Sequence, residues 1–166
     1  MDGRVGLDSE PGRGSLFWFE LPLPAGAGPP RQAKTAGPAD RITYLNRAPR
    51  ILVAEDNKTN QLIVRGMLQR LGCQVAVVEN GAEAVAAAQR DAFDLIFTDI
   101  SMPVMDGLEA SRRMRGLGLT LPIVALTADI TMEGDNLRSH GIDACITKPV
   151  SPPKLRQSLA AMLPSV

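Results

Sequence analysis

The stretch DLIFTDISMPVMDGLEA, residues 94–110, decides the fold of this chain. Its apolar run at 95–97 has the length of a short buried strand and leads directly into Thr98 and Asp99. A Met-Pro and an Asp-Gly dipeptide follow at once, and both favour a tight turn ahead of a helix. A buried strand that ends on a carboxylate and then turns sharply predicts that Asp99 lies at the rim of a sheet.

Similar apolar runs occur on both sides of this stretch, and segments of helical character separate them. The expected strands are 51–54, 75–78, 94–97, 122–126 and 144–147, and the expected helices are 58–71, 81–90, 106–116, 131–140 and 151–163. Runs that are continuously apolar indicate strands buried on both faces, as in a parallel sheet covered by helices. The sequence therefore predicts an α/β fold built from five strand-helix repeats.

The expected helices carry local signals of their own. In the first helix, five apolar residues have spacings compatible with one face: Leu62, Val64, Met67, Leu68 and Leu71. Ser151 followed by Pro152 is typical of a helix start, with the serine as cap. His140 followed by Gly141 is typical of a helix C-terminus, and we prefer this interpretation to a phosphorelay role for the histidine.

Composition excludes several classes of protein. The 166 residues carry 18 basic and 18 acidic side chains, so the zero net charge gives no support for a nucleic-acid binder. The two cysteines, Cys73 and Cys145, form no metal-binding pattern, and we expect two reduced core thiols. No apolar run approaches the roughly 20 residues of a membrane span, and no signal peptide is recognisable. We expect a cytoplasmic chain without membrane contact of its own.

The chain divides into three parts by composition. Residues 1–24 are rich in glycine and then apolar, which predicts two strands around a Ser-Glu-Pro-Gly turn. Residues 25–48 are rich in glycine, alanine and proline and show no periodicity, which predicts a flexible linker. Residues 49–166 hold the regular strand-helix pattern and form the predicted main domain.

Polar side chains follow four of the five apolar runs, at the carboxyl ends of the expected strands. They are Glu55 with Asp56, Asp99, Thr127 and Lys148. Right-handed crossovers bring these ends to one edge of the sheet, where open α/β sheets bind ligands. Clustered carboxylates suit a hard cation such as Mg²⁺, and an aspartate can attack phosphorus. A hydroxyl and an ammonium group nearby would hold phosphoryl oxygens.

These motifs resemble the receiver domain of two-component response regulators over about residues 50–163. The matching segments are ILVAEDNKTNQLIVRGMLQRLG, DLIFTDISMPVMDGLEA, PIVALTA and TKP. The resemblance implies a doubly wound, flavodoxin-like sheet of strand order 2-1-3-4-5 with helices on both faces. It also implies Asp99 as phosphoacceptor, Thr127 as switch hydroxyl and Lys148 as the phosphate-binding lysine. Mg²⁺ would be held by Glu55, Asp56, Asp99 and the backbone carbonyl of Ser101.

The resemblance has one exception. Receivers usually carry tyrosine or phenylalanine three residues before the lysine, whereas this chain has Cys145. We therefore expect no aromatic rotamer switch coupled to Thr127.

Residues 3–21 are similar to the last glycine box and closing strands of the ATP-binding domain of sensor histidine kinases, with Gly12 and Gly14 at the glycine-box positions. The resemblance implies the C-terminal part of a hybrid kinase, whose longer protein could carry a membrane anchor. The remaining ATP-site motifs are absent from the sequence, so we expect no kinase activity from this chain.

The implied partner is a phosphohistidine, on a histidine kinase or a phosphotransfer domain, and the oligomeric state stays open. Two other functions agree less well with the sequence. An aspartyl-phosphate phosphatase or phosphotransferase often has a second aspartate two residues after the nucleophile, but that position is Ser101. An interaction domain without phosphorylation would not need Asp56, Asp99, Thr127 and Lys148 together. A phosphoryl-accepting receiver is the function that the sequence predicts.

Overall fold

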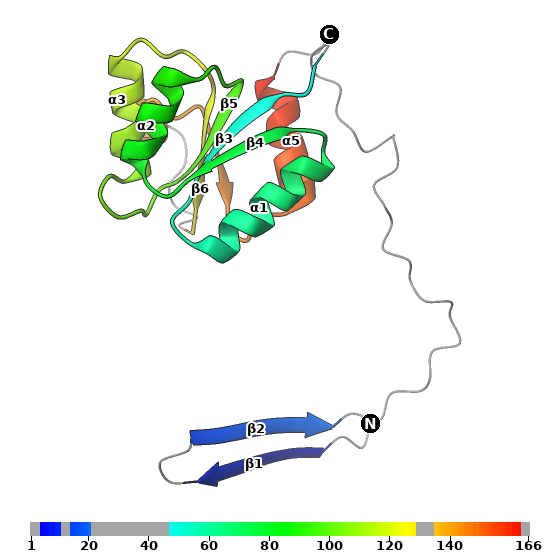
Figure 1. The fold of residues 1–166 in the computed structure, drawn as a ribbon. Helices are drawn as coiled ribbons and strands as arrows, with labels where there is room; N and C mark the ends of the chain where they lie inside the picture. Colours follow the sequence, from blue (N-terminus) through cyan, green and yellow to red (C-terminus); the bar gives the residue numbers. More distant parts are fainter. Residues whose placement is uncertain (1–3, 11–13, 21–46, 129–134, 164–166) are drawn as a thin grey trace. The chain divides into compact units, whose positions relative to one another are not determined.

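The computed structural model describes residues 4–10, 14–20, 47–128 and 135–163. They belong to two units, an N-terminal β-hairpin and an α/β domain, and each unit is described by itself (Figure 1). Residues 11–13, which include Gly12, residues 21–46, which include most of the predicted linker, and residues 131–134 of the fourth expected helix lie outside the described residues. Among the described helices, none is both long and apolar enough to cross a membrane.

The α/β domain alternates strands and helices as the sequence predicts. Its elements are β3 (Arg50–Ala54), α1 (Lys58–Arg70), β4 (Gln74–Val78), α2 (Gly81–Arg90), β5 (Leu95–Asp99), α3 (Gly107–Gly116), β6 (Ile123–Thr127), α4 (Asp135–Ser139), β7 (Ala144–Thr147) and α5 (Pro152–Met162). The five strands are parallel, in the order β4-β3-β5-β6-β7. This order confirms the predicted doubly wound, flavodoxin-like topology.

The central strands are buried on both faces, but the edge strand β4 is not. All residues of β5 and β6 are buried, whereas Gln74 and Ala76 of β4 are exposed. The apolar run in β4 therefore reflects a half-buried edge, because β4 pairs only with β3. A continuous apolar run indicates burial on both faces only where helices cover both faces of the strand, and this cover is incomplete at the edge of the sheet.

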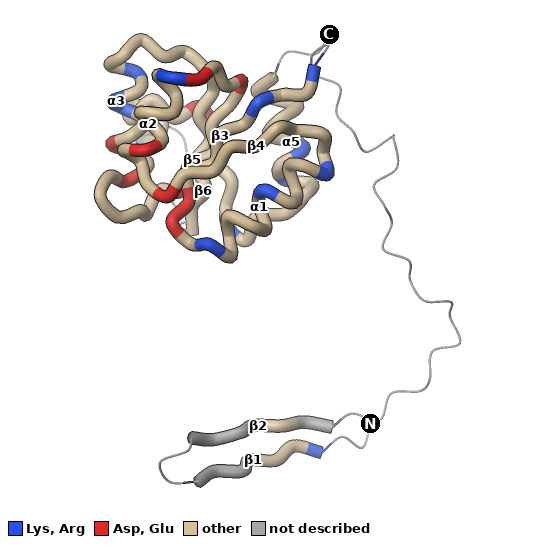
Figure 2. The backbone as a smooth tube through the Cα atoms, viewed as in Figure 1, with Lys and Arg blue, Asp and Glu red and all other residues tan. Residues whose placement is uncertain are grey.

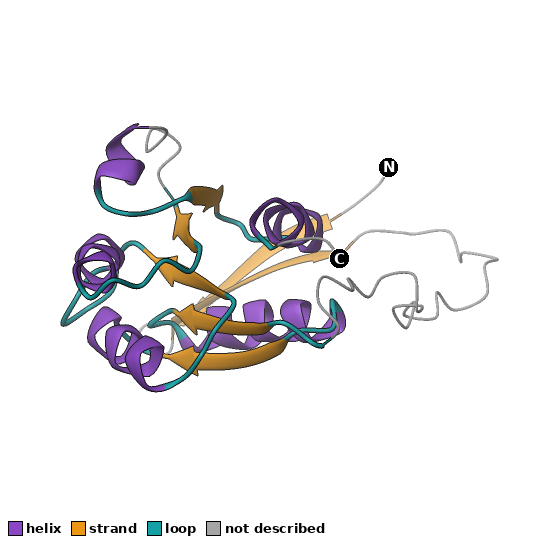
Figure 3. Cartoon of the chain, turned by 90° about the horizontal axis from the view of Figure 1, so that it is seen from above, coloured by secondary structure: helices purple, strands orange, loops and turns teal. Residues whose placement is uncertain are grey.

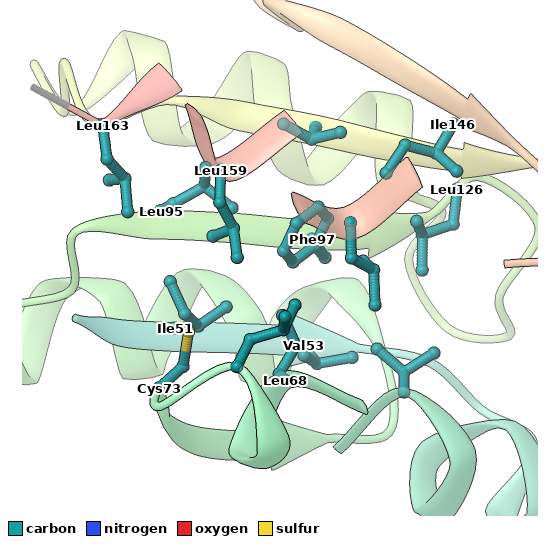
Figure 4. Packing of buried hydrophobic residues seen from close by; sticks show 14 residues of the cluster. Ile51, Val53, Leu68, Cys73, Leu95, Phe97, Leu126, Ile146, Leu159 and Leu163 are labelled. Atoms are coloured by element: carbon teal, nitrogen blue, oxygen red, sulfur yellow. The ribbon is translucent and has the colours of Figure 1, made fainter. Parts of the chain in front are cut away.

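Helices α1 and α5 pack on one face of the sheet, where branched aliphatic side chains fill the core (Figure 4). The labelled residues of this cluster are Ile51, Val53, Leu68, Cys73, Leu95, Phe97, Leu126, Ile146, Leu159 and Leu163. At roughly 25 cal/mol per Å² of apolar surface, such burial is the main term that stabilises the sheet.

Helices α2 and α3 cover the opposite face, and Figure 3 shows helices on both sides of the strands. The inner side of α2 is made of small residues, namely Ala84, Ala87 and Ala88. Larger side chains from the neighbouring helix and from the loop after β5, including Met102 and Met114, complete this second core.

The face of α1 differs from the sequence prediction at one position. Val64, Leu68 and Leu71 are buried in the core as expected, but Leu62 is 70% exposed. Residue 62 lies two positions before Val64, which is about 200° around a helix of 3.6 residues per turn. Helical geometry therefore places Leu62 on the side opposite Val64, and the expectation for Leu62 was wrong.

Glycine ends three helices in the same way. At the end of α4, the N–H of Ile142 donates to the carbonyl of Leu137, and that of Gly141 to Arg138. Gly141 has a positive φ of 79°, which completes a Schellman motif and confirms the predicted cap at His140-Gly141. Gly72 and Gly118 do the same after α1 and α3.

The start of α5 fits its sequence signal only in part. Ser151 is the N-cap residue and Pro152 the first helical residue, as predicted. The Ser151 side chain makes no capping hydrogen bond, however. Pro153, at the second helical position, lacks one of the two N–H groups to which such a cap could bond.

The hairpin pairs β1 (Arg4–Glu10) with β2 (Gly14–Glu20) in antiparallel register. Gly6 lies opposite Trp18, and a Cβ at Gly6 would collide with the indole ring. The glycine thus makes room for the aromatic ring across the strands. The predicted pair of N-terminal strands is confirmed.

Candidate functional site

The polar residues predicted to converge lie at the carboxyl edge of the sheet. Asp99 and Thr127 are the last residues of the neighbouring strands β5 and β6. Glu55 and Asp56 directly follow β3, and Lys148 directly follows β7. Parallel strands end at the same edge, so chain segments that are distant in sequence meet there.

Three carboxylates form a cluster at this edge. One oxygen from each of Glu55, Asp56 and Asp99 lies within 4.8 Å of the others. Glu55 and Asp99 are buried, whereas Asp56 is exposed. Figure 2 shows acidic positions in the loop between β3 and α1, which brings two of the three carboxylates to the edge.

Lys148 bridges the two buried carboxylates. Its Nζ donates to Asp99 Oδ2 at 2.6 Å and to Glu55 Oε2 at 3.0 Å. The backbone N–H of Lys148 donates to the carbonyl of Thr127 at 2.7 Å, which fixes the start of the loop after β7. The Lys148–Asp99 contact was predicted in general terms, but the bond to Glu55 was not.

The charges in the cluster alter one another's proton affinity. Burial raises the pKa of the Asp99 carboxyl, the charge of Glu55 adds to the rise, and the bonds from Lys148 and Ser101 oppose it. Burial acts to lower the pKa of Lys148, but its bonds to Asp99 and Glu55 outweigh this effect and raise it. Lys148 therefore stays a cation, while Asp99 takes up a proton at a higher pH than an ordinary aspartate does.

The Glu55 carboxylate is held by groups that the sequence analysis did not identify. Asn60 Nδ2 donates to Glu55 Oε1 at 2.9 Å, and the N–H of Asn57 donates to the same oxygen at 3.3 Å. Gln61 Nε2 donates to the carbonyl of Glu55 at 2.6 Å. Amide residues in the first turns of a helix that follows a strand-end carboxylate are the signal that could have indicated this arrangement.

The loop after β5 contains the sharp turn that the sequence predicts after Asp99. The N–H of Ser101 donates to Asp99 Oδ1 at 3.2 Å, so the loop folds back onto the carboxylate. Val104 has a positive φ of 69°, and the N–H of Met105 donates to the carbonyl of Pro103 at 2.8 Å in a γ-turn.

Helix α3 then starts directly beside the strand end. A Cβ at Gly107 would collide with the carbonyl oxygen of Asp99, and the N–H of Gly107 donates to the carbonyl of Ile100 at 3.0 Å. Gly107 is therefore required for this close approach, which keeps Asp99 at the rim.

Two other predicted residues lie in less open surroundings, Thr127 at this edge and Cys145 further back along the neighbouring strand. The side chain of Thr127 is 3% exposed, so the hydroxyl is largely covered. Cys145 lies in β7, is half-buried against the α2–α3 core and belongs to no disulfide. Both positions agree with the predicted strands.

The donor set of the cluster fits a hard divalent cation. All three side chains offer carboxylate oxygens, and oxygen ligands are what Mg²⁺ and Ca²⁺ prefer in proteins. The single ammonium of Lys148 leaves net negative charge among these four groups, which a cation would offset.

Comparison with known proteins agrees with this geometry. Residues 51–160 match the family model of the response regulator receiver domain. The chain is 37% identical over 169 residues to Two-component system protein A of Emericella nidulans. The match includes 90% of this chain and 24% of that relative. The chain thus spans about a quarter of the relative.

Two solved structures show the same fold. The receiver domain of sensor histidine kinase PA1611 from Pseudomonas aeruginosa, with a magnesium ion in its active-site cleft, is 35% identical with a TM-score of 0.64, covering 69% of this chain and 97% of that one. The receiver domain of Ssk1 from Saccharomyces cerevisiae, crystallised with the histidine phosphotransfer protein Ypd1, is 28% identical with a TM-score of 0.66, covering 70% and 89%. The chain therefore belongs to the family of response regulator receiver domains, the modules of two-component phosphorelays that accept phosphoryl groups.

Proposed function

We propose that Asp99 is the residue of this receiver that accepts the phosphoryl group, from a phosphohistidine and with Mg²⁺. The observation that carries the proposal is the Asp99 carboxylate itself. It ends a buried strand, touches the Lys148 ammonium at 2.6 Å and lies within 4.8 Å of two other carboxylates. An aspartate so placed can attack phosphorus at the edge of the sheet.

The transfer forms one bond and breaks one. An oxygen of Asp99 bonds to phosphorus to give an acyl phosphate, and the phosphorus–nitrogen bond of the donor breaks as its histidine keeps the electron pair. Lys148 would pair with a phosphoryl oxygen as a point charge, and the Thr127 hydroxyl would donate to another. Negative charge builds up on the phosphoryl oxygens during transfer, so fixed positive charge lowers the barrier.

Asp56, Asp99 and Glu55 would hold the cation, together with the carbonyl of Ser101. When bound, Mg²⁺ would neutralise charge on the phosphoryl group and on the carboxylates. Glu55 is buried and already bonded to Asn60 and Lys148, which favours contact with the cation through a bridging water molecule. The exposed Asp56 favours direct contact.

A phosphotransfer protein or a histidine kinase is the donor that fits best. The support is the co-crystal of the Ssk1 receiver with Ypd1, a histidine phosphotransfer protein. The donor that we propose for this chain is therefore a phosphohistidine.

The hairpin is proposed to be the end of a histidine kinase ATP-binding domain, at residues 1–24, joined by a linker at 25–48 to the receiver at 49–166. Support comes from the antiparallel pairing of β1 with β2 and from the glycine at the head of β2. A hybrid histidine kinase with a cytoplasmic receiver would be the longer protein.

The test is intact-mass measurement after incubation with acetyl phosphate. The wild-type chain should gain one phosphoryl group only when Mg²⁺ is present, and the Asp99→Asn variant should gain none. Hydroxylamine should remove the label, because it cleaves an acyl phosphate. Equal labelling of both chains, or a label that survives hydroxylamine, would exclude Asp99 as the acceptor.

A further inference from the structure

The ammonium group of Lys154 lies against the chain segment that carries Lys148. Lys154 Nζ donates to the carbonyl of Thr147 at 2.7 Å, to the Thr147 hydroxyl at 3.2 Å and to the carbonyl of Pro149 at 3.4 Å. Thr147 and Pro149 are the two chain neighbours of Lys148. One cation thus contacts the carbonyl groups of both chain neighbours of Lys148.

The backbone around Lys148 has little other support from the sheet. Strand β7 is an edge strand that pairs with β6 alone. The N–H of Lys148 donates to Thr127 in β6, which fixes one side of the segment. The bonds from Lys154 in α5 hold the carbonyl groups of Thr147 and Pro149 on either side of Lys148.

The position of Lys154 is unfavourable for the helix itself. Helix α5 begins at Pro152, so Lys154 lies in its first turn, where the helix dipole disfavours a cation. This first turn contains no acidic residue that would offset the positive charge, and the Ser151 side chain accepts no capping hydrogen bond from its backbone N–H groups. A residue that breaks a local preference and gains specific partners instead is typical of a functional constraint.

We propose that Lys154 is a positioning residue for Lys148. It fixes the backbone from Thr147 to Pro149, so that the Lys148 ammonium reaches Asp99 at 2.6 Å and Glu55 at 3.0 Å. Among the described residues, Lys154 contacts Thr147 and Pro149 but neither the Asp99 nor the Glu55 carboxylate. Its effect on phosphorylation rests on the proposed function of Asp99, whereas its effect on the backbone does not.

The experiment compares three variants of the full chain. Lys154→Met removes the donor and keeps most of the aliphatic stem. Lys154→Arg keeps a donor that can reach the same carbonyls. Arg112→Met, at an exposed arginine of α3, is a control with the same loss of charge. Amide hydrogen exchange measured by NMR reports the Lys148 backbone, and intact mass reports the rate of phosphorylation by acetyl phosphate with Mg²⁺.

Lys154→Met should speed exchange at the Lys148 amide while amides of the central strands stay protected. The phosphorylation rate at saturating donor should fall about tenfold, as is usual when a group that orients a site residue is lost. Lys154→Arg should restore most of both values, and Arg112→Met should change neither.

Three results decide between the alternatives. Unchanged exchange at Lys148 in Lys154→Met, or faster exchange throughout the domain, would overturn the positioning role. Faster exchange at Lys148 with unchanged phosphorylation would overturn its link to the reaction. If even the wild-type chain takes no phosphoryl group but exchange at Lys148 responds as expected, the positioning of the backbone is supported and the proposed function of Asp99 fails.

Discussion

Glu55 and Asp56 are neighbours in the chain, but their surroundings differ. The Glu55 side chain is 1% exposed, and its oxygens already accept bonds from Asn60 and Lys148. Asp56 is exposed at the rim of the same cluster. Sequence alone makes the two acids look alike, and their burial separates the roles that they can take.

The two acids should therefore contribute unequally to Mg²⁺ binding. Asp56→Asn should lower the affinity on the order of tenfold or more, because it removes a charged direct ligand of a hard ion. Glu55→Gln should lower it less, since Glu55 would act through water. Isothermal titration with Mg²⁺ measures both, and a stronger loss in Glu55→Gln than in Asp56→Asn would contradict the assignment.

The two thiols should differ in reactivity, since burial raises the pKa of Cys73 to about 11. The thiolate is the reactive form, so Cys73 should be alkylated by iodoacetamide far more slowly than the half-buried Cys145 near pH 8. Its rate should still rise beyond pH 9, because the thiolate fraction grows as pH approaches the pKa. Peptide mapping after brief labelling reports each thiol.

Urea provides the control for this comparison. In the unfolded chain, Cys73 and Cys145 should be labelled at similar rates, because burial is lost. Faster labelling of Cys73 than of Cys145 in the folded chain would contradict the burial of Cys73.

Much of the site could be predicted from residues at strand ends. Asp99, Thr127 and Lys148 each follow or end an apolar run, and parallel topology brings such ends together. The partners of Glu55 could not be predicted in the same way. They depend on side-chain directions in the first turns of α1 and in the loop after β7, which apolar spacing does not encode.

At the scale of elements, one arginine joins the end of α3 to the loop before β6 and to the loop before β7. Arg115 Nη1 donates to the carbonyls of Leu119 at 2.7 Å and Leu121 at 2.9 Å, and Nε donates to that of Gly141 at 3.0 Å. Nη2 pairs with Asp143 Oδ2 at 2.7 Å. The guanidinium thus satisfies carbonyl groups that lie outside any helix or strand.

Loss of this arginine should destabilise the domain. Arg115→Ala should lower the free energy of unfolding by about 2 kcal/mol, because several half-buried carbonyls lose a charged donor. Arg113→Ala is the matched control, since Arg113 makes an exposed ion pair with Glu109 on the same helix. It should change stability by about 0.5 kcal/mol or less. Urea unfolding followed by circular dichroism measures both, and equal losses would refute a special role for Arg115.

Elements were more predictable than their faces. In the described part of the domain, the helices and strands lie where apolar runs and turn signals indicated, and of the expected helix 131–140 the structure describes residues 135–139 as helix. The exposure of Leu62 and the half-exposed strand β4 were not predicted. Both depend on which side of an element has a neighbour, and the spacing of apolar residues does not settle this.

At the scale of the whole molecule, the described part of the α/β domain starts at Arg47. Arg47 makes two bonds to the Asp94 carboxylate, at 2.7 and 2.8 Å, and the N–H of Arg50 donates to the same group at 2.7 Å. Burial alone would raise the pKa of Asp94, but the bonds from Arg47 and Arg50 outweigh it and lower the pKa. A lowered pKa means that this contact stabilises the domain at neutral pH and is lost in acid.

A chain that begins at Arg47 should therefore keep the whole working domain. Deletion of residues 1–46 removes the hairpin but leaves the bonds to Asp94, the core and the carboxylate cluster in place. We expect this shortened chain to take up a phosphoryl group on Asp99 at the rate of the full chain, with the same requirement for Mg²⁺. Intact mass after acetyl phosphate treatment measures both rates. Arg47→Ala in this shortened chain serves as the control because it removes only the guanidinium that pairs with Asp94, and its melting temperature should be slightly lower near pH 7. That difference should shrink as the pH falls through the low pKa of Asp94, since the protonated carboxyl no longer pairs with the guanidinium. If the chain without residues 1–46 loses Mg²⁺-dependent phosphorylation, the N-terminal segment belongs to the working site and the proposed division of the chain is wrong.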